Sequence, residues 1–343
     1  MSWDWTDETL AALQAFLSDR GLATGPLTTR RIGDGHSNLT FLVGDGEREV
    51  VVRRPPPPPV PPGGHDVLRE ARLIQALTGT DVPVAEVLAV AEAGEVLDVP
   101  FYVMEYVRGF VVTDSTPDPL AVPEHRREIA ESFIDVLAAL HAVDWRARGL
   151  EDFGRPEGFN ARHLRRIGGL VRDEDGNPPA AFAEIEAWLA ANVPAESGES
   201  IVHNDYRIGN VMLGAEPPGR VVAVLDWELA TIGDPLLDVG YILASYPREG
   251  EPTTPTQDLA RAVLEPGYPS REELAERYAA RTGRDLSDLS WYRAMSDWKI
   301  GVLYEYARRR GEDAYYADPA LVERFLAAAH RAAGLDPVPS SGS

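Results

Sequence analysis

The sequence contains no cysteine and no long run of apolar residues. Without cysteine, the chain has no disulfide, no thiolate nucleophile and no Cys-based zinc site, so a metal would have to be bound by oxygen or imidazole ligands. No apolar stretch reaches the roughly 18 residues needed for a membrane helix, and residues 1–5 lack the basic and apolar regions of a signal peptide. These absences predict a cytoplasmic protein.

Basic residues are also scarce. The chain has 33 Lys and Arg against 55 Asp and Glu, which gives a formal net charge of −22. This charge repels nucleic acid phosphates and anionic lipid surfaces, so we expect neither nucleic acid nor a membrane as a partner. The same excess of acid is typical of a soluble surface and does not indicate an oligomeric state.

The first third of the chain alternates apolar and polar residues with a period of two, which is typical of strands. Asp45-Gly46 lies between two such stretches and predicts a tight hairpin turn. Helical spacing of leucine and other apolar residues predicts one helix before the strands and one among them. The expected strands are 27–32, 38–43, 49–53, 87–90 and 101–107, and the expected helices are 6–18 and 66–77.

Beyond Gly109 the pattern becomes mainly helical. Ser270 and Glu273 form a capping box at the start of one helix, and Gly283 is typical of a helix end. Strands followed by helices predict an α+β chain of two lobes, 1–108 and 109–343, with the boundary near Arg108. The expected helices are 123–141, 180–192, 235–246, 270–281, 290–310 and 319–333.

The most informative segment runs from His203 to Asn210, followed by Asp226. Phosphoryl transfer from ATP needs a carboxylate beside the attacking hydroxyl and oxygen ligands that hold Mg²⁺ against the phosphates. In the kinase pattern H-R-D-x-x-x-x-N, the Asp is the base and the Asn binds metal. Asp205 and Asn210 have the same spacing, so the segment predicts a phosphoryl-transfer site.

Five stretches resemble the aminoglycoside phosphotransferase-like small-molecule kinases, a family with a two-lobed protein-kinase-like fold. The resemblance covers nearly the whole chain, and it is strongest for the branch that includes kinase-like domains fused to acyl-CoA dehydrogenases. It implies a small, mostly antiparallel N-terminal lobe that binds nucleotide and a larger, mainly helical C-terminal lobe with the catalytic loop and substrate site. The matching stretches are 35–40, 52–56, 101–106, 203–210 and 224–241.

In the C-terminal lobe, the resemblance implies that Asp205 accepts or orients the proton of the substrate hydroxyl, and that Asn210 and Asp226 bind Mg²⁺. Arg207 stands two residues after Asp205, where many protein kinases place a lysine that contacts the γ-phosphate. A guanidinium can grip phosphate in the same way, although a fold-stabilising ion pair explains Arg207 equally well. His203 is expected to support the loop without taking part in the chemistry.

In the N-terminal lobe, the resemblance places Gly35 and Ser37 in the loop that covers the phosphates. Residues 104–107 resemble a kinase hinge, which implies adenine contacts with the backbone at Glu105 and Val107.

The chain departs from the general kinase pattern at the phosphate-binding lysine, because the third strand carries Arg53 in its place. Strand alternation puts Val51 and Arg53 on one face and sends Arg54 to the other, and Glu70 on the next helix is the expected ion-pair partner of Arg53. A second departure is Glu228, where protein kinases have glycine. It is either another metal contact or a surface residue.

These features predict an ATP- and Mg²⁺-dependent kinase that phosphorylates a hydroxyl group of a small molecule. The alternative is a non-catalytic nucleotide-binding scaffold, which Arg53 and a proline-rich stretch at 55–62 would suit. A metal-dependent hydrolase is a third possibility. The acceptor stays open between an aminoglycoside-like compound and a hydroxyacyl-CoA or hydroxy acid.

Overall fold

A computed structural model describes residues 5–33, 38–56, 66–311 and 313–335. The chain forms two compact units, one made of residues 1–108 and 222–228 and the other of residues 109–221 and 229–343. The segment 222–228 therefore belongs to the first unit, although the sequence pattern had placed it with the second.

The first unit is built on a five-stranded sheet with the strand order β1-β2-β3-β5-β4, in which every neighbouring pair is antiparallel. The hairpin between β2 and β3 forms around Gly46, whose φ is +92°. This is the turn that Asp45-Gly46 predicted. The strands are β1 (Thr28–Arg31), β2 (Leu39–Gly44), β3 (Glu49–Arg54), β4 (Val87–Ala91) and β5 (Phe101–Glu105).

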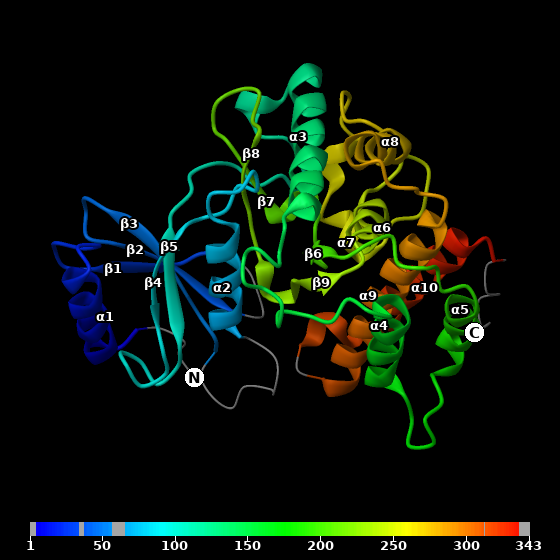
Figure 1. The fold of residues 1–343 in the computed structure, drawn as a ribbon, viewed down its shortest axis with the longest axis horizontal. Helices are drawn as coiled ribbons and strands as arrows, with labels where there is room; N and C mark the ends of the chain where they lie inside the picture. Colours follow the sequence, from blue (N-terminus) through cyan, green and yellow to red (C-terminus); the bar gives the residue numbers. More distant parts are fainter. Residues whose placement is uncertain (1–4, 34–37, 57–65, 312, 336–343) are drawn as a thin grey trace. The chain divides into compact units, whose positions relative to one another are not determined.

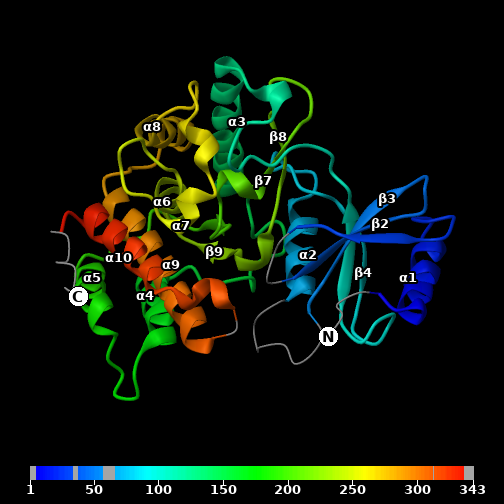
Figure 2. The ribbon, with the colours of Figure 1, turned by 180° about the vertical axis from the view of Figure 1, so that it is seen from behind.

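Helices α1 (Asp7–Asp19) and α2 (Val67–Leu77) lie on opposite faces of this sheet, as Figures 1 and 2 show. Val52 points to the α1 side and is fully buried there among apolar side chains of α1 and the sheet. Because side chains alternate along a strand, its neighbour Arg53 points to the α2 side. Arg54 returns to the α1 side, where its guanidinium lies 5.4 Å from the centre of the Phe41 ring.

The second unit is mainly helical and is organised around α9, which contacts α4, α5, α6 and α10. Helix α6 crosses α9 closely at Gly240, where a Cβ atom would lie 2.5 Å from the backbone of Tyr292, so only glycine fits there. The helices are α3 (Pro123–Ala142), α4 (Phe159–Gly168), α5 (Ala180–Ala191), α6 (Leu236–Ser245), α7 (Pro255–Asp258), α8 (Arg271–Thr282), α9 (Leu289–Arg310) and α10 (Pro319–Ala333).

Short strands join these helices and position the loop that carries Asp205. β6 (Ser200–Val202) pairs antiparallel with β9 (Thr231–Gly233), and it leads directly into that loop. Two further strands, β7 (Val211–Leu213) and β8 (Val221–Val224), follow the loop. The connection between them is closed by a hydrogen bond from Gly214 N to Arg220 O.

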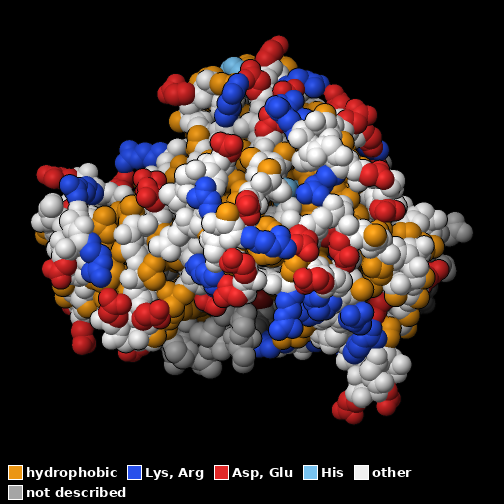
Figure 3. All heavy atoms as spheres, viewed as in Figure 1, with side chains coloured by type: hydrophobic (Ala, Val, Ile, Leu, Met, Phe, Trp, Pro, Cys, Tyr) orange, Lys and Arg blue, Asp and Glu red, His pale blue; other side chains and the backbone are white. Residues whose placement is uncertain are grey.

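The α+β class is confirmed, with a small antiparallel sheet in the N-terminal part and a larger, mainly helical C-terminal part. On the face drawn in Figure 3, acidic and basic side chains are interspersed. Among the described residues, no helix combines the length and the apolar character required to cross a membrane.

Candidate active site

Arg53 on β3 faces three carboxyl groups, all within the first unit. Its Nε donates to Glu70 Oε2 on α2 at 3.0 Å, and its Nη2 donates to Asp226 Oδ1 at 2.6 Å. The same Nη2 lies 3.6 Å from Glu228 Oε2. The ion pair between Arg53 and Glu70 is therefore formed, while phosphate binding by Arg53 stays a prediction.

Burial and charge act against each other in this cluster. Burial works to lower the pKa of Arg53, but Glu70, Asp226 and Glu228 outweigh it and raise that pKa, so the guanidinium stays charged. Burial raises the pKa of Glu70 to about 7, and the two other carboxylates add to this effect against the attraction of Arg53. One cation thus faces an excess of carboxyl groups.

Asp226 follows β8 in a left-handed backbone conformation, with φ of +63°. Such a φ is uncommon for a residue other than glycine, and it often marks functional sites. The turn is held by Arg53 and by the buried indole of Trp227, whose Nε1 donates to Val224 O at 3.0 Å. The Asp226 side chain keeps 38% of its surface exposed and can therefore reach a ligand from solvent.

Glu228 accepts a hydrogen bond from Asn38 Nδ2 at 3.3 Å and has 22% of its side chain exposed. It is therefore part of the charged cluster around Arg53 and is more than a surface residue. Its role toward a metal stays a prediction.

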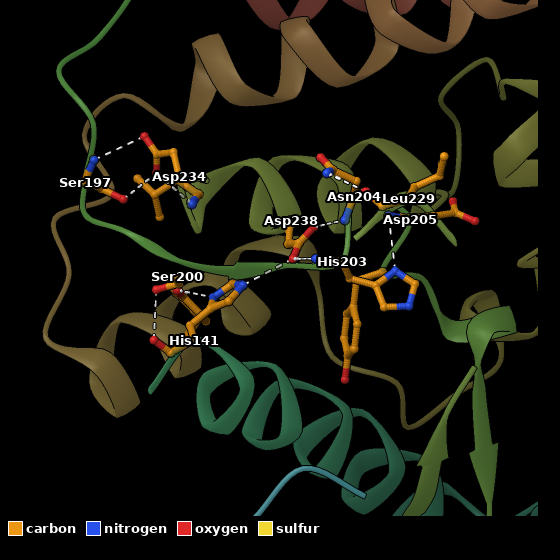
Figure 4. Close-up of polar contacts among 12 residues, drawn as sticks. His141, Ser197, Ser200, His203, Asn204, Asp205, Leu229, Asp234 and Asp238 are labelled. Carbon is orange, nitrogen blue, oxygen red and sulfur yellow. Dashed lines mark hydrogen bonds and ion pairs between the residues drawn. The ribbon is translucent and has the colours of Figure 1, made fainter. Parts of the chain in front are cut away.

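In the second unit, Asp238 on α6 fixes the backbone of the loop that carries Asp205. Its two carboxylate oxygens accept hydrogen bonds from His203 N and Asn204 N, both at 2.7 Å, as Figure 4 shows. A third donor is His141 Nε2 at 3.2 Å. Burial works to raise the pKa of Asp238, but the hydrogen bonds from His141 and from His203 N help to outweigh it and hold that pKa below its ordinary value.

Asp234 anchors the start of α6. It accepts hydrogen bonds from Leu236 N at 3.0 Å, from Ser197 Oγ at 2.6 Å and from Tyr292 Oη at 2.6 Å. It therefore satisfies a backbone N–H at the start of α6 and ties that helix to the loop of Ser197, as Figure 4 shows. The contact with Tyr292 ties it to α9 as well. Asp234 and Asp238 together make α6 a fixed support for the loop.

Asp205 and Asn210 lie side by side at the end of this loop. Asn210 Nδ2 donates to Asp205 Oδ2 at 2.6 Å and to the Asp205 backbone carbonyl at 2.9 Å. Because both partners are acceptors, this atom of the amide must be nitrogen, and the amide oxygen must point the other way. Asn210 thus holds the carboxylate with one atom and presents an oxygen of the kind that Mg²⁺ prefers with the other.

Arg207 and His203 occupy different positions around Asp205. Arg207 Nε lies 3.9 Å from Asp205 Oδ1, a long ion pair that leaves the guanidinium able to bind another anion. His203 is fully buried, and its Nδ1 accepts the backbone N–H of Asp205 at 3.2 Å. This contact makes His203 a support of the loop.

Two further residues that contact the loop were not singled out from the sequence. Tyr241 Oη, on α6, donates a hydrogen bond to Asp205 Oδ1. Lys299 on α9 donates to Asn204 O at 2.9 Å. A lysine between the buried residues Trp298 and Ile300 was the available signal, since an ammonium is rarely buried without a purpose.

The remaining predicted nucleotide contacts lie in the first unit. Glu105 ends β5, and its N–H donates to Glu86 O at 2.9 Å, while its contact with adenine stays a prediction. Val107 follows two residues later and is partly buried. Gly35 and Ser37 lie outside the described residues.

The sequence model of the phosphotransferase enzyme family matches residues 28–294. The chain belongs to this family. Acyl-CoA dehydrogenase family member 11 of Gallus gallus is 34% identical over 292 residues, which make up 83% of this chain and 37% of that protein. Family member 10 of Mus musculus is 29% identical over 289 residues, 84% of this chain and 27% of that protein. The chain therefore spans well under half the length of these relatives.

Solved structures agree with this assignment. A Ralstonia eutropha protein, provisionally assigned as an aminoglycoside phosphotransferase, is 31% identical with a TM-score of 0.76, and the match covers 94% of this chain and 98% of that one. A thermostable variant of aminoglycoside phosphotransferase APH(4)-Ia, solved with AMP-PNP and hygromycin B, shares the fold at 18% identity and a TM-score of 0.60, with 97% and 99% covered. The predicted family, its acyl-CoA-dehydrogenase-associated branch and the protein-kinase-like fold are confirmed.

Proposed function

We propose that the chain is an ATP- and Mg²⁺-dependent O-phosphotransferase that acts on a hydroxyl group of a small molecule. The observation that carries the proposal is the Asp205–Asn210 pair, in which the amide nitrogen fixes the carboxylate and leaves the amide oxygen on the other side. Phosphoryl transfer depends mostly on positioning and on neutralising charge, and a loop held in advance is suited to it.

In this proposal, Asp205 receives the proton of the acceptor hydroxyl as its oxygen attacks the γ-phosphorus. The bond from that phosphorus to the bridging oxygen breaks, and ADP leaves. Arg207 contacts the transferred phosphoryl group. Asn210 and Asp226 are the ligands for Mg²⁺, which neutralises phosphate charge when bound. Both supply hard oxygen atoms, and Mg²⁺ commonly uses one or two protein ligands beside phosphates and water.

The first unit supplies the nucleotide contacts in this proposal. Arg53 binds phosphate oxygens and is held for this task by Glu70. The backbone at Glu105 and Val107 pairs with adenine. Gly35 and Ser37 belong to the loop that covers the phosphates.

The charges near Asp205 favour an anionic acceptor, such as a hydroxy acid or hydroxyacyl-CoA, over a polycationic aminoglycoside. Lys299 is buried within electrostatic reach of Asp205. Burial lowers the pKa of His163 well below its ordinary value, and Lys299, Arg166 and Arg162 lower it further, so Lys299 is one of several cations around His163. In the described part of the chain, none of these three cations is paired with a carboxylate.

A non-catalytic scaffold is the alternative, and a hydrolase is the third candidate. The buried hydrogen bonds that fix the backbone of the Asp205 loop support a catalytic function. A scaffold protein needs no fixed carboxylate at this position. A hydrolase would use water as the acceptor and release phosphate.

A screen of ADP release with mass spectrometry of the products separates the three. Acceptors to test are hydroxy acids, hydroxyacyl-CoAs, aminoglycosides and amino alcohols, with an Asp205→Ala control. A phosphorylated product that depends on Asp205 supports the kinase. Nucleotide binding without any product supports the scaffold, and phosphate release alone supports the hydrolase.

A further inference from the structure

Helix α6 presents two side chains to the loop that carries Asp205. Asp238 holds the loop backbone, and Tyr241, one turn later on the same face of the helix, donates its hydroxyl to Asp205 Oδ1. Asn210 holds the other oxygen, Oδ2, at 2.6 Å. Each carboxylate oxygen thus has one side-chain donor, and the rotation of the carboxylate is fixed from both sides.

Tyr241 is suited to act as a permanent donor. The side chain is 6% exposed, and burial, followed by the charge of Asp205, raises the pKa of Tyr241 well above its ordinary value. The phenol therefore keeps its proton throughout the physiological pH range. A protonated tyrosine can give a hydrogen bond to the carboxylate but cannot compete with it as a base.

Lys299 supports the same arrangement from α9. Its Nζ donates to the carbonyl of Asn204, a residue with the uncommon φ of +65°, and lies 4.9 Å from the centre of the Tyr241 ring. Lys299 is 8% exposed and has no carboxylate partner among the described residues. Placing an ammonium there costs free energy, which the carbonyl and the ring offset in part.

We infer that Tyr241 and Lys299 are positioning residues for the reaction: Tyr241 fixes the carboxylate of Asp205 for proton transfer, and Lys299 fixes the peptide that precedes it. The inference rests on the proposed function, and it assigns roles to two residues outside the predicted metal and nucleotide contacts. Within the described ranges, Arg207 and Asn210 on its own loop also contact the Asp205 carboxylate.

The test compares Tyr241→Phe with Tyr246→Phe. The two changes remove the same hydroxyl from two buried tyrosines, one on α6 and one directly after its last residue, but Tyr246 Oη donates to Pro269 O at 2.9 Å and does not contact Asp205. With the acceptor found in the screen, Tyr241→Phe is expected to lower kcat about tenfold or more and to leave the KM for Mg-ATP within about twofold. Tyr246→Phe is expected to leave both constants unchanged.

Double variants with Asp205→Asn show whether Tyr241 acts through the carboxylate. The effect of Tyr241→Phe is expected to vanish in the Asp205→Asn background, because the two residues work as one unit. An undiminished effect would overturn the inference, as would equal kcat values for wild type and Tyr241→Phe.

Lys299→Met is expected to lower kcat without lowering the Tm, and a normal kcat would remove Lys299 from the proposal.

A spectroscopic measurement separates failure of this inference from failure of the proposed function. A buried hydroxyl proton donated to a carboxylate exchanges slowly and resonates downfield of the amides. This proton signal is expected in wild type and in Tyr246→Phe, and it is expected to disappear in Tyr241→Phe. Its absence from wild type would contradict the inference, whereas its presence without phosphorylation of any acceptor would contradict the proposed function.

Discussion

The predicted functional residues of the two units are held in place by different forces. In the first unit, Arg53 is bound by side-chain ion pairs to Glu70 and Asp226, and Asp226 is 38% exposed. In the second unit, the loop at Asp205 is fixed through backbone N–H groups by Asp238, which is fully buried. In the proposed function, the residues of the first unit are the exchangeable half, a charge cluster, and those of the second unit are the rigid half, a fixed support for the loop.

This difference matches what each half has to do in the proposed reaction. Arg53 occupies an oxygen of Asp226, so Mg²⁺ and phosphate have to exchange or share these partners when nucleotide binds. Asp226 is partly exposed, so a ligand from solvent can share or replace its contact with Arg53, whereas the Arg53–Glu70 pair is buried. In the proposal, Asp205 keeps its hydrogen bonds with Tyr241 and Asn210, and holding the base in advance lowers the cost of reaching the transition state. The two non-glycine residues with positive φ in the described chain, Asn204 and Asp226, lie one in each half.

The largest expected effect comes from breaking the rigid half. Asp238→Ala leaves the N–H groups of His203 and Asn204, and His141 Nε2, without their buried acceptor. We expect a loss of about 3–5 kcal/mol in the free energy of unfolding, because buried donors would lose a charged partner. Urea denaturation measures it, and a loss below about 1 kcal/mol would show that the loop does not depend on this carboxylate.

A smaller effect is expected in the exchangeable half. Arg53→Ala is expected to weaken Mg-ATP binding about 10- to 100-fold, while the free energy of unfolding changes much less than in Asp238→Ala. Arg53→Lys keeps the charge but loses the guanidinium, whose Nε and Nη2 bind Glu70 and Asp226 at the same time. We therefore expect it to recover only part of the affinity for Mg-ATP. Isothermal titration calorimetry measures both. Full affinity in Arg53→Ala would remove this residue from the nucleotide site.

The smallest expected effect is a pH dependence of the free energy of unfolding. It compares two buried carboxyl groups, Asp297 and Glu70, of which only Glu70 forms an ion pair with Arg53. Burial raises the pKa of Asp297 on α9 to about 7, and neither carboxylate oxygen has a hydrogen-bond partner in the described chain. The folded protein then binds a proton more readily than the unfolded chain, so this group's contribution to stability falls as the pH rises from about 4 to about 7.

Asp297→Asn removes that proton-binding group. The variant is expected to be more stable than wild type by about 1–3 kcal/mol at pH 8, and the difference should shrink toward pH 5. Thermal unfolding at both pH values measures it. Glu70→Gln provides the matched case, since the pKa of Glu70 is also about 7 but the residue holds Arg53. Only Glu70→Gln is expected to weaken Mg-ATP binding.

Much of the fold could be predicted because its signals are local. The capping box at Ser270 and the left-handed Gly283 delimit α8 as expected. Helix α10 has the predicted bounds, and α3 and α9 differ from prediction by one residue at one end. Helix α4 was missed because Gly158 precedes it without a side-chain cap and because its arginines obscure the apolar face.

The site was predictable only where its residues are close in sequence. The spacing from Asp205 to Asn210 is local, and strand alternation is enough to place Arg53 toward α2. Tyr241 and Lys299 reach Asp205 and Asn204 across 36 and 95 positions of the chain. Which buried tyrosine or lysine meets a loop depends on how helices pack, as the close crossing of α6 and α9 at Gly240 illustrates.

The most direct test of the account is single-turnover transfer from Mg-ATP to the acceptor in wild type and in Asp205→Asn, with the Kd for Mg-ATP measured on the same samples. The account predicts that the variant binds Mg-ATP within about threefold of wild type and transfers its phosphoryl group at least about a thousandfold more slowly. Transfer at the wild-type rate in Asp205→Asn would contradict it.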